Sequence, residues 1–218
     1  HNLVLADVLS RKNGRNRLLP EYGILIFDEA HKLPEAARQM YGICFENVEL
    51  ERATASIYRA VVNRPEKKEA IRLCKEMLEL NAAFFEYIKN FAEVQCTHGH
   101  VEGVFAPSAL LSLKALSAVI KSLSMLFYTA DRRNTVYRNI SGRLEQKRKM
   151  LALLSDHTGL ICWLEYTKVT VCRLCALPKQ LDFLLHEDLW GNGNPYLLTS
   201  ATLSVGGDFG HFMHQTGI

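Results

Sequence analysis

Two acidic residues and a histidine lie close together directly after an apolar segment. Asp28, Glu29 and His31 follow the run 22–27, which is preceded by Pro20. Such a run is typical of a strand that is buried on both faces of a parallel sheet. Carboxylates at its end lie at the mouth of the sheet, where ligands of open α/β sheets bind. One carboxylate can then hold Mg²⁺, and the other can activate a water molecule as a general base.

The sequence Asp28-Glu29-Ala30-His31 matches the DEAH form of the Walker B box. In that interpretation Asp28 holds Mg²⁺ beside the β- and γ-phosphates of ATP, Glu29 is the general base, and His31 senses the γ-phosphate. The alternative is the acidic first turn of a following helix, because acidic side chains stabilise helix N-termini. The tetrapeptide alone leaves both interpretations open.

A hydroxyl-rich segment follows a second short apolar run, about 170 residues further along the chain. Thr199, Ser200, Ala201 and Thr202 come directly after the run 196–198. A strand followed by DEAH and a strand followed by Thr-Ser-Ala-Thr are a far more specific pair than either motif alone. We therefore expect the two strands to lie side by side in one sheet, with the carboxylates next to the hydroxyls.

Three segments of the chain resemble the DinG/XPD family of superfamily 2 DNA helicases. They are HNLVLAD (residues 1–7), LPEYGILIFDEAHKL (19–33), which resembles the Walker B strand of the family, and PYLLTSATL (195–203), which resembles its motif III. The segments 163–165 and 177–190 also look like the family. The resemblance covers both ends of the chain, whereas the middle matches in helical character only.

The resemblance implies an internal fragment of an ATP-dependent DNA helicase with 5′ to 3′ polarity, acting in DNA repair or replication. In this family a helical arch is inserted after the Walker B strand, and together with an upstream iron–sulfur domain it guards a pore for single-stranded DNA. Residues 1–44 and 159–218 would be two segments of the first motor domain, and residues 45–158 would be the arch. Ser200 and Thr202 would hydrogen-bond with the DEAH element and couple hydrolysis to motion of the motor domains.

Hydrophobic periodicity also indicates an insertion. Between residues 45 and 157 the apolar positions recur with helical spacing, in long segments separated at 63–65, 98–107 and 139–142. The clearest row, expected to pack against other helices, is Leu113, Leu116, Ile120, Leu123 and Phe127. The predicted fold class is an α/β motor-domain fragment, with a partial parallel sheet of the P-loop type and a large all-helical arch insertion.

The chain on either side of this insertion has the spacing of strands and short helices. Residues 160–174 are predicted to form a hairpin that turns at 166–168. Helices are predicted at 3–9, 33–41 and 180–190. A sheet assembled from so few strands has open edges, which predicts self-association of the fragment.

Several family features are missing from these 218 residues. No Gly-x-x-x-x-Gly-Lys-Ser/Thr phosphate-binding loop occurs, so the fragment alone is not expected to hydrolyse ATP. The cysteines of an iron–sulfur cluster in the parent protein would lie upstream of His1. The six cysteines present are predicted to be reduced, and neither Cys172-x-x-Cys175 nor Cys96-x-His98-x-His100 has the spacing of a complete metal site.

Basic residues cluster between positions 131 and 149, although the net charge of the chain is only +3. A stripe of this kind could follow the phosphates of single-stranded or forked DNA without reading bases. The candidate DNA-binding residues are Arg132, Arg133, Arg143, Lys147 and Arg148. An ordinary solvated helix face is the alternative.

Composition bounds the remaining classes. With 48% hydrophobic and 22% charged residues the chain is expected to fold, and no continuous apolar run approaches the ~20 residues of a membrane span. We expect a cytoplasmic, nucleoid-associated protein without a membrane partner. Two other classes stay open: a non-enzymatic helical module that binds protein or nucleic acid, and a DinG-type relative with nuclease activity.

Overall fold

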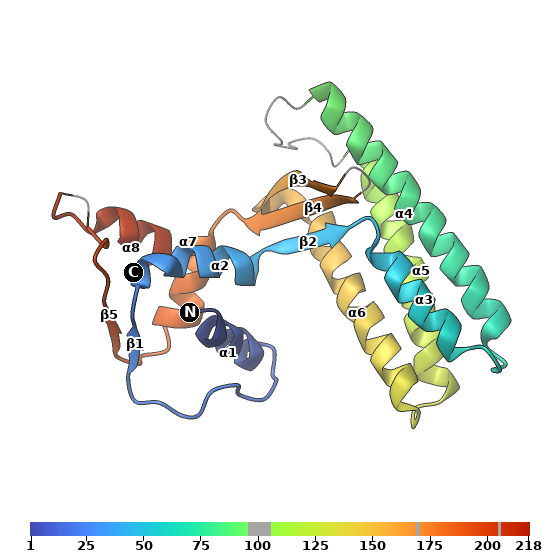
Figure 1. Ribbon diagram of the computed structural model, residues 1–218, viewed down its shortest axis with the longest axis horizontal. Helices are drawn as coiled ribbons and strands as arrows, with labels where there is room; N and C mark the ends of the chain where they lie inside the picture. Colours follow the sequence, from blue (N-terminus) through green and yellow to red (C-terminus); the bar gives the residue numbers. More distant parts are fainter. Residues whose placement is uncertain (96–105, 169–170, 205) are drawn as a thin grey trace. The chain divides into compact units, whose positions relative to one another are not determined.

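The chain divides into two compact units (Figure 1). The computed structural model describes residues 1–95, 106–168, 171–204 and 206–218. The terminal unit contains His1–Gly42 and Leu177–Ile218, and the inserted unit contains Ile43–Ala176. The inserted unit extends beyond the predicted arch, 45–158, because the strands up to residue 176 group with its helices.

The terminal unit is built around a small parallel sheet. Its strands are β1 (Leu25–Phe27) and β5 (Tyr196–Leu198), paired in register from Leu25 opposite Tyr196 to Phe27 opposite Leu198. The two apolar runs that precede the chemical motifs thus pair as predicted. The remaining elements are α1 (Asn2–Lys12), η1 (Ala30–Lys32), α2 (Leu33–Tyr41), α7 (Leu181–Leu185), a π-helical turn η3 (His186–Trp190) and α8 (Gly210–Thr216).

The helices of this unit bury one core beside β1. Leu5 of α1, Phe27 of β1, Leu33 of α2 and Leu189 of η3 are all in this core. Pro34 is accommodated in the first turn of α2, where a missing N–H costs no intrahelical hydrogen bond. The helix predicted over 180–190 forms in two pieces, α7 and the π-helical turn η3.

Two buried carboxylates fix the connections around β1. Asp7, 1% exposed, accepts hydrogen bonds from the amides of Leu18 (2.6 Å) and Leu19 (3.0 Å) and pairs with Arg11. Asp188 accepts from Lys12 Nζ at 2.7 Å and from the hydroxyl of Tyr41 at 2.9 Å. These contacts hold the loop before β1 and join α1, α2 and η3.

The inserted unit combines four helices with a three-stranded sheet. The helices are α3 (Glu49–Ala60), α4 (Lys67–Gln95), α5 (Pro107–Ala130) and α6 (Thr135–Ser155), followed by the 3-10 turn η2 (His157–Gly159). The strands are β2 (Ile43–Glu46), β3 (Leu160–Lys168) and β4 (Val171–Pro178), in the order β2-β4-β3. Within the predicted arch, residues 45–158, the described chain is helical except at the end of β2. The strands β3 and β4, predicted as a hairpin outside the arch, group with its helices. Residues 166–168, predicted as a turn, belong to β3.

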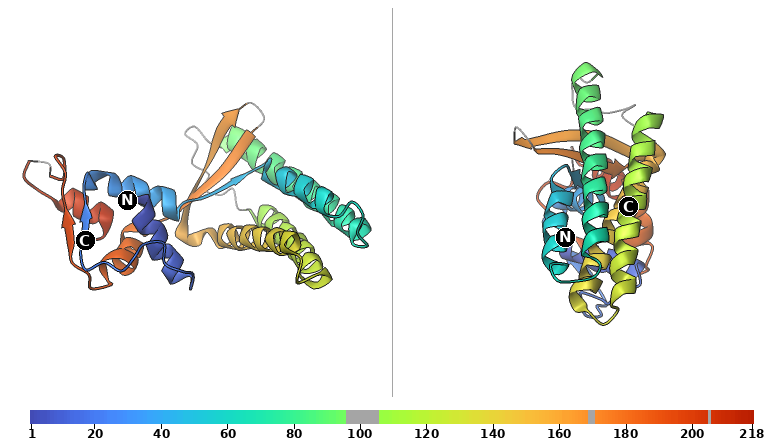
Figure 2. Two further views of the ribbon diagram at one scale, coloured as in Figure 1. Left: turned by 60° about the horizontal axis from the view of Figure 1, so that its bottom comes forward. Right: turned by 90° about the vertical axis from the view of Figure 1, so that its right-hand side faces the viewer.

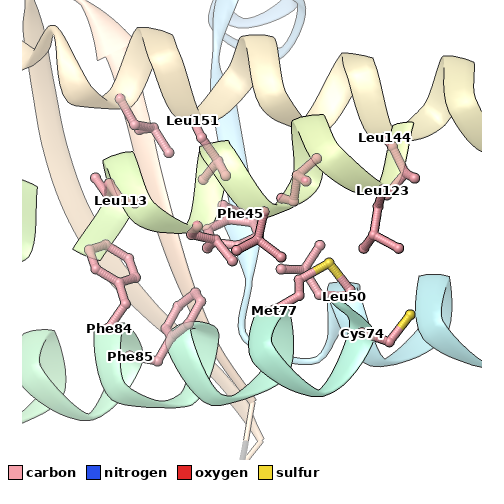
Figure 3. Packing of buried hydrophobic residues seen from close by; sticks show 14 of the residues in the cluster. Phe45, Leu50, Cys74, Met77, Phe84, Phe85, Leu113, Leu123, Leu144 and Leu151 are labelled. Carbon is pink, nitrogen blue, oxygen red and sulfur yellow. The ribbon is translucent and has the colours of Figure 1, made fainter. Parts of the chain in front are cut away.

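One core holds the helices and the sheet of this unit together. The helices α4, α5 and α6 run alongside one another (Figure 2). Phe45 of β2 reaches between the helices and contacts Phe85 of α4, which in turn packs against Phe84 (Figure 3). The predicted row is confirmed, since Leu113, Leu116, Ile120, Leu123 and Phe127 are all completely buried.

The predicted helix break at 139–142 is wrong, because these residues lie inside α6. The break falls earlier, where the Asn134 side chain accepts hydrogen bonds from the amides of Val136 (3.0 Å) and Tyr137 (3.3 Å) and caps the helix. Ser141 meets Ser124 of α5, their hydroxyl oxygens 2.9 Å apart. The segment 139–142, whose sequence predicts a turn, thus belongs to α6 and contributes a contact with α5.

Helix α5 is long and apolar enough, by length and composition, to cross a membrane. It is at the same time the helix that carries the row of buried residues in the core of the inserted unit. Buried core helices of ordinary globular proteins have the same composition, so this feature assigns no membrane role.

Candidate active site

The site is positioned by the carboxyl ends of β1 and β5. Beyond the paired strands, the Thr199 amide donates to Phe27 O at 2.9 Å, and the Ala30 amide donates to Thr199 O at 2.9 Å. The ladder therefore continues past the apolar residues on both sides. As a result the DEAH residues and the Thr-Ser-Ala-Thr residues, distant in sequence, lie next to each other.

Asp28 is fixed by contacts to one of its carboxylate oxygens. The Thr199 hydroxyl donates to Asp28 Oδ1 at 2.8 Å, and the Glu29 amide donates to the same oxygen at 3.0 Å. Within the described part of the chain the other oxygen, Oδ2, makes no hydrogen bond. This arrangement orients the carboxylate while one of its oxygens stays available to a ligand.

His31, Ser200 and Glu29 form a second set of contacts. His31 Nδ1 lies 2.8 Å from the Ser200 hydroxyl oxygen and 3.1 Å from Glu29 Oε2. The Ser200 hydroxyl is also 3.5 Å from Glu29 Oε2, at the outer limit of a hydrogen bond. A proton on His31 Nδ1 can thus be shared between the motif that carries the carboxylates and the motif that carries the hydroxyls.

Glu29 has a left-handed backbone conformation, with φ 51° and ψ 48°. No other non-glycine residue of the described segments has a positive φ. This conformation costs a residue with a side chain on the order of 1–2 kcal/mol, and such strain gathers at functional sites. The side chain is half-exposed at 51%. Glu29 is therefore held in an unfavourable conformation with its carboxylate accessible.

The donor set can be compared with the needs of Mg²⁺. This ion prefers oxygen ligands, keeps several waters and binds nucleotide phosphates with only one or two protein carboxylates. Asp28, with its free Oδ2, fits that pattern. No group of three or more metal-binding side chains occurs in the described residues. A site of this chemistry does not require one, since phosphates and water complete the shell.

The hydroxyl segment is only partly arranged as expected. Ser200 contacts the DEAH element as predicted, but the described contact of Thr202 is its own amide donating to Ser200 Oγ at 3.3 Å. Thr199 instead makes the second link, to Asp28. Ala201 is exposed and provides spacing. The described hydroxyl contacts to the DEAH element thus come from Ser200 and from Thr199, the residue directly after β5, and not from Thr202.

The basic candidates of the inserted unit have different surroundings. Lys147 is paired with Glu49 of α3, and Arg148 makes two hydrogen bonds to Glu145, at 2.8 and 2.6 Å. Both charges are already partnered.

The other three candidates are less occupied. Arg132 lies over the ring of Tyr128, 4.9 Å from its centre, and Arg133 is exposed. Arg143 is exposed as well, and no side-chain partner contacts it within the described segments. The predicted five-residue stripe is thus reduced to three available guanidinium groups. The Cys96-x-His98-x-His100 candidate lies outside the described residues.

The structure brings the two motif segments together at the ends of paired strands, and comparison with known proteins finds relatives over the whole chain. The chain is similar over its whole length to proteins named ATP-dependent DNA helicase, which confirms the resemblance inferred from the three motif segments. No protein-family model matches the chain.

Two of these relatives carry the name ATP-dependent DNA helicase YoaA. The Escherichia coli protein is 26% identical over 227 aligned residues, which include 100% of this chain and 34% of the relative. The Haemophilus influenzae protein is 28% identical over 224 aligned residues, again 100% of this chain and 34% of the relative. The chain therefore spans about one third of the length of these curated relatives.

Proposed function

We propose that this chain is part of an ATP-dependent DNA helicase and carries the hydrolytic half of its nucleotide site. Asp28 would hold Mg²⁺, Glu29 would activate the attacking water, and His31 would sense the γ-phosphate. Bound Mg²⁺ would neutralise charge on the phosphates of ATP. The observation that carries the proposal is the contact of Asp28 and His31 with Thr199 and Ser200 across the paired ends of β1 and β5.

Thr199, Ser200, Ala201 and Thr202 would couple hydrolysis to translocation. A nucleotide that draws Glu29 or His31 toward its γ-phosphate must change the shared contacts with Ser200. Because Ser200 is on the segment that follows β5, the state of the nucleotide would reach the rest of the motor through that segment. The 5′ to 3′ polarity and the role in DNA repair or replication are further parts of this proposal.

The inserted unit would be the arch beside the path of single-stranded DNA. Its support is the grouping of Ile43–Ala176, four helices and a small sheet, as one compact unit between the two motif segments. Arg132, Arg133 and Arg143 would contact phosphates, while Lys147 and Arg148 would mainly stabilise the unit through their acidic partners. A DNA helicase would act where the DNA is, so we propose a cytoplasmic location for the parent protein.

Hydrolysis by this segment alone is not part of the proposal, because a phosphate-binding loop is missing from its sequence. An upstream iron–sulfur domain or nuclease domain is equally outside it. Self-association stays a prediction: among the described strands β1 and β5 pair only with each other, which leaves each with one open edge.

The decisive experiment uses the full-length helicase that the proposal requires. Glu29→Gln should lower DNA-stimulated ATP hydrolysis by roughly 10²–10⁴-fold while ATP binding stays within a few-fold of wild type, because only the general base is lost. The matched control is Glu35→Gln, an exposed change on the nearby helix α2. Ser200→Ala should retain hydrolysis but reduce unwinding.

Three results would count against this function. Unchanged ATP hydrolysis in Glu29→Gln would refute the assignment of Glu29 as the general base. An equal loss of hydrolysis in Glu35→Gln would show that the effect of Glu29→Gln is nonspecific. If the full-length protein bound DNA but showed no ATP hydrolysis, the alternative of a non-enzymatic helical module would be favoured.

A further inference from the structure

Cys44 and Cys175 lie directly opposite each other on neighbouring strands. The strands β2 and β4 are antiparallel (Figure 1). Their register pairs Cys44 with Cys175. The two Sγ atoms are 2.9 Å apart. A disulfide bond needs about 2.0 Å between its sulfur atoms. A very small movement of two side chains would therefore join these thiols.

The ladder geometry favours such a bond. Cys44 and Cys175 are direct partners in the register of the antiparallel strands β2 and β4. Directly opposing residues of antiparallel strands have Cα atoms about 4.5–5.5 Å apart. That separation lies within the range of about 4.4–6.8 Å observed for disulfides.

The two thiols differ in access. Cys44 is exposed, whereas Cys175 is completely buried. Burial, followed by the hydrogen bond with Cys44, raises the pKa of the Cys175 thiol well above its ordinary value. Cys44 is thus the thiol that meets an oxidant from solution, and Cys175 is the one that resolves the product.

We propose that Cys44 and Cys175 are a redox-sensitive dithiol that is oxidised to an intramolecular disulfide by a low-molecular-weight disulfide. The Cys44 thiolate attacks one sulfur of the oxidant, forming a mixed disulfide and releasing one small thiolate. Cys175 then attacks Cys44 Sγ, its proton passing to the second small thiolate as that leaves. Two protein thiols lose two electrons, and one small disulfide is reduced to two thiols.

The position of the pair gives the bond a structural consequence. The chain enters the inserted unit at residue 43 and leaves it after residue 176. Cys44 and Cys175 lie at these two crossings, so a disulfide would close the whole inserted unit into one covalent loop. Long closed loops restrict the unfolded chain strongly. Oxidation would therefore stabilise the inserted unit and fix its two connections to the rest of the chain.

The test is oxidation of the purified chain in defined mixtures of reduced and oxidised glutathione. Mass spectrometry should find the loss of two hydrogens and, after digestion without reduction, one linked pair of peptides that contains residues 44 and 175. Oxidation should raise the thermal unfolding midpoint by about 5–10 °C. Cys44→Ser should abolish both effects, and the control Cys74→Ala, a buried thiol elsewhere in the core, should retain the link.

Three outcomes would overturn the proposal. They are a stable glutathione adduct on Cys44 without a protein disulfide, a disulfide that joins any other cysteines, and the absence of oxidation across the glutathione range. Peptide mapping of the unchanged sequence decides among these even if a variant folds poorly. The result is independent of ATP hydrolysis, so it can fail while the proposed function holds.

Discussion

Replacement of Gly142 by alanine is expected to stabilise the inserted unit by about 0.5–1 kcal/mol. Gly142 lies in the interior of α6, is exposed, and has no positive φ. A Cβ atom placed on it meets no atom within 4 Å. Alanine therefore adds no clash and restricts the unfolded chain. For a unit of this size the gain corresponds to a rise of roughly 2–5 °C in the unfolding midpoint.

The assay is thermal unfolding followed by far-ultraviolet circular dichroism, with Gly217→Ala as the control. Gly217 has φ 73°, and a Cβ atom there would overlap the carbonyl group of Asp182. The same chemical change should therefore lower stability at Gly217 and raise it at Gly142. A lower midpoint for Gly142→Ala would refute the reasoning, because it would mean that residues 139–142 interrupt the helix.

Changes at three other sites test the two cores and the basic residues. Asp7→Ala should cost about 2–4 kcal/mol in denaturant unfolding, because two backbone amides lose their acceptor. Burial opposes ionisation of Asp7, but the hydrogen bonds from these amides and a nearby guanidinium hold its pKa below the usual 3.8. Its contribution is then complete above about pH 4 and lost as the pH falls through the folded pKa; a cost that persists in acid would contradict this. Phe84→Ala should destabilise by about 3–5 kcal/mol and the exposed Leu111→Ala by less than about 0.5, so equal values would refute the assigned core. Arg143→Ala should weaken binding to single-stranded DNA and reduce the salt dependence by about one phosphate contact, more than Lys147→Ala does, as measured by fluorescence anisotropy; the reverse order would exclude a direct role for Arg143.

The location of the candidate site could be predicted because its signals are local. Each motif directly follows a short apolar run, and both runs are strands that pair in parallel. The exact contacts could not be predicted in the same way. The amide of Ala30 binds Thr199 O, and this register brings the Thr199 hydroxyl to Asp28 and leaves Thr202 further along the chain. The register of a strand pair depends on both strands, so it cannot be predicted from either motif alone.

The inserted unit was harder to predict for a related reason. Strand β2 has only four residues, and its partner β4 lies more than 120 residues away in sequence. A strand this short forms only because it pairs with another strand. The spacing of apolar residues does not indicate a partner so far away in sequence. The helix break was misplaced because a local turn signal at Gly142 competes with the packing of Ser141 against Ser124. Long periodic segments such as α5 were predicted well, since each turn repeats the same burial.

The backbone of Glu29 offers a way to separate strain from chemistry at the candidate site. Glu29→Gly and Glu29→Ala both remove the carboxylate, so both should abolish the hydrolysis proposed for the full-length protein. Only glycine adopts φ 51° without steric cost. Glu29→Gly should therefore be more stable than Glu29→Ala by about 1 kcal/mol, measured by denaturant unfolding of the chain. Equal stability of the two variants would mean that the left-handed conformation stores no strain. The predicted difference would instead show that a carboxylate is retained here against the preference of the backbone.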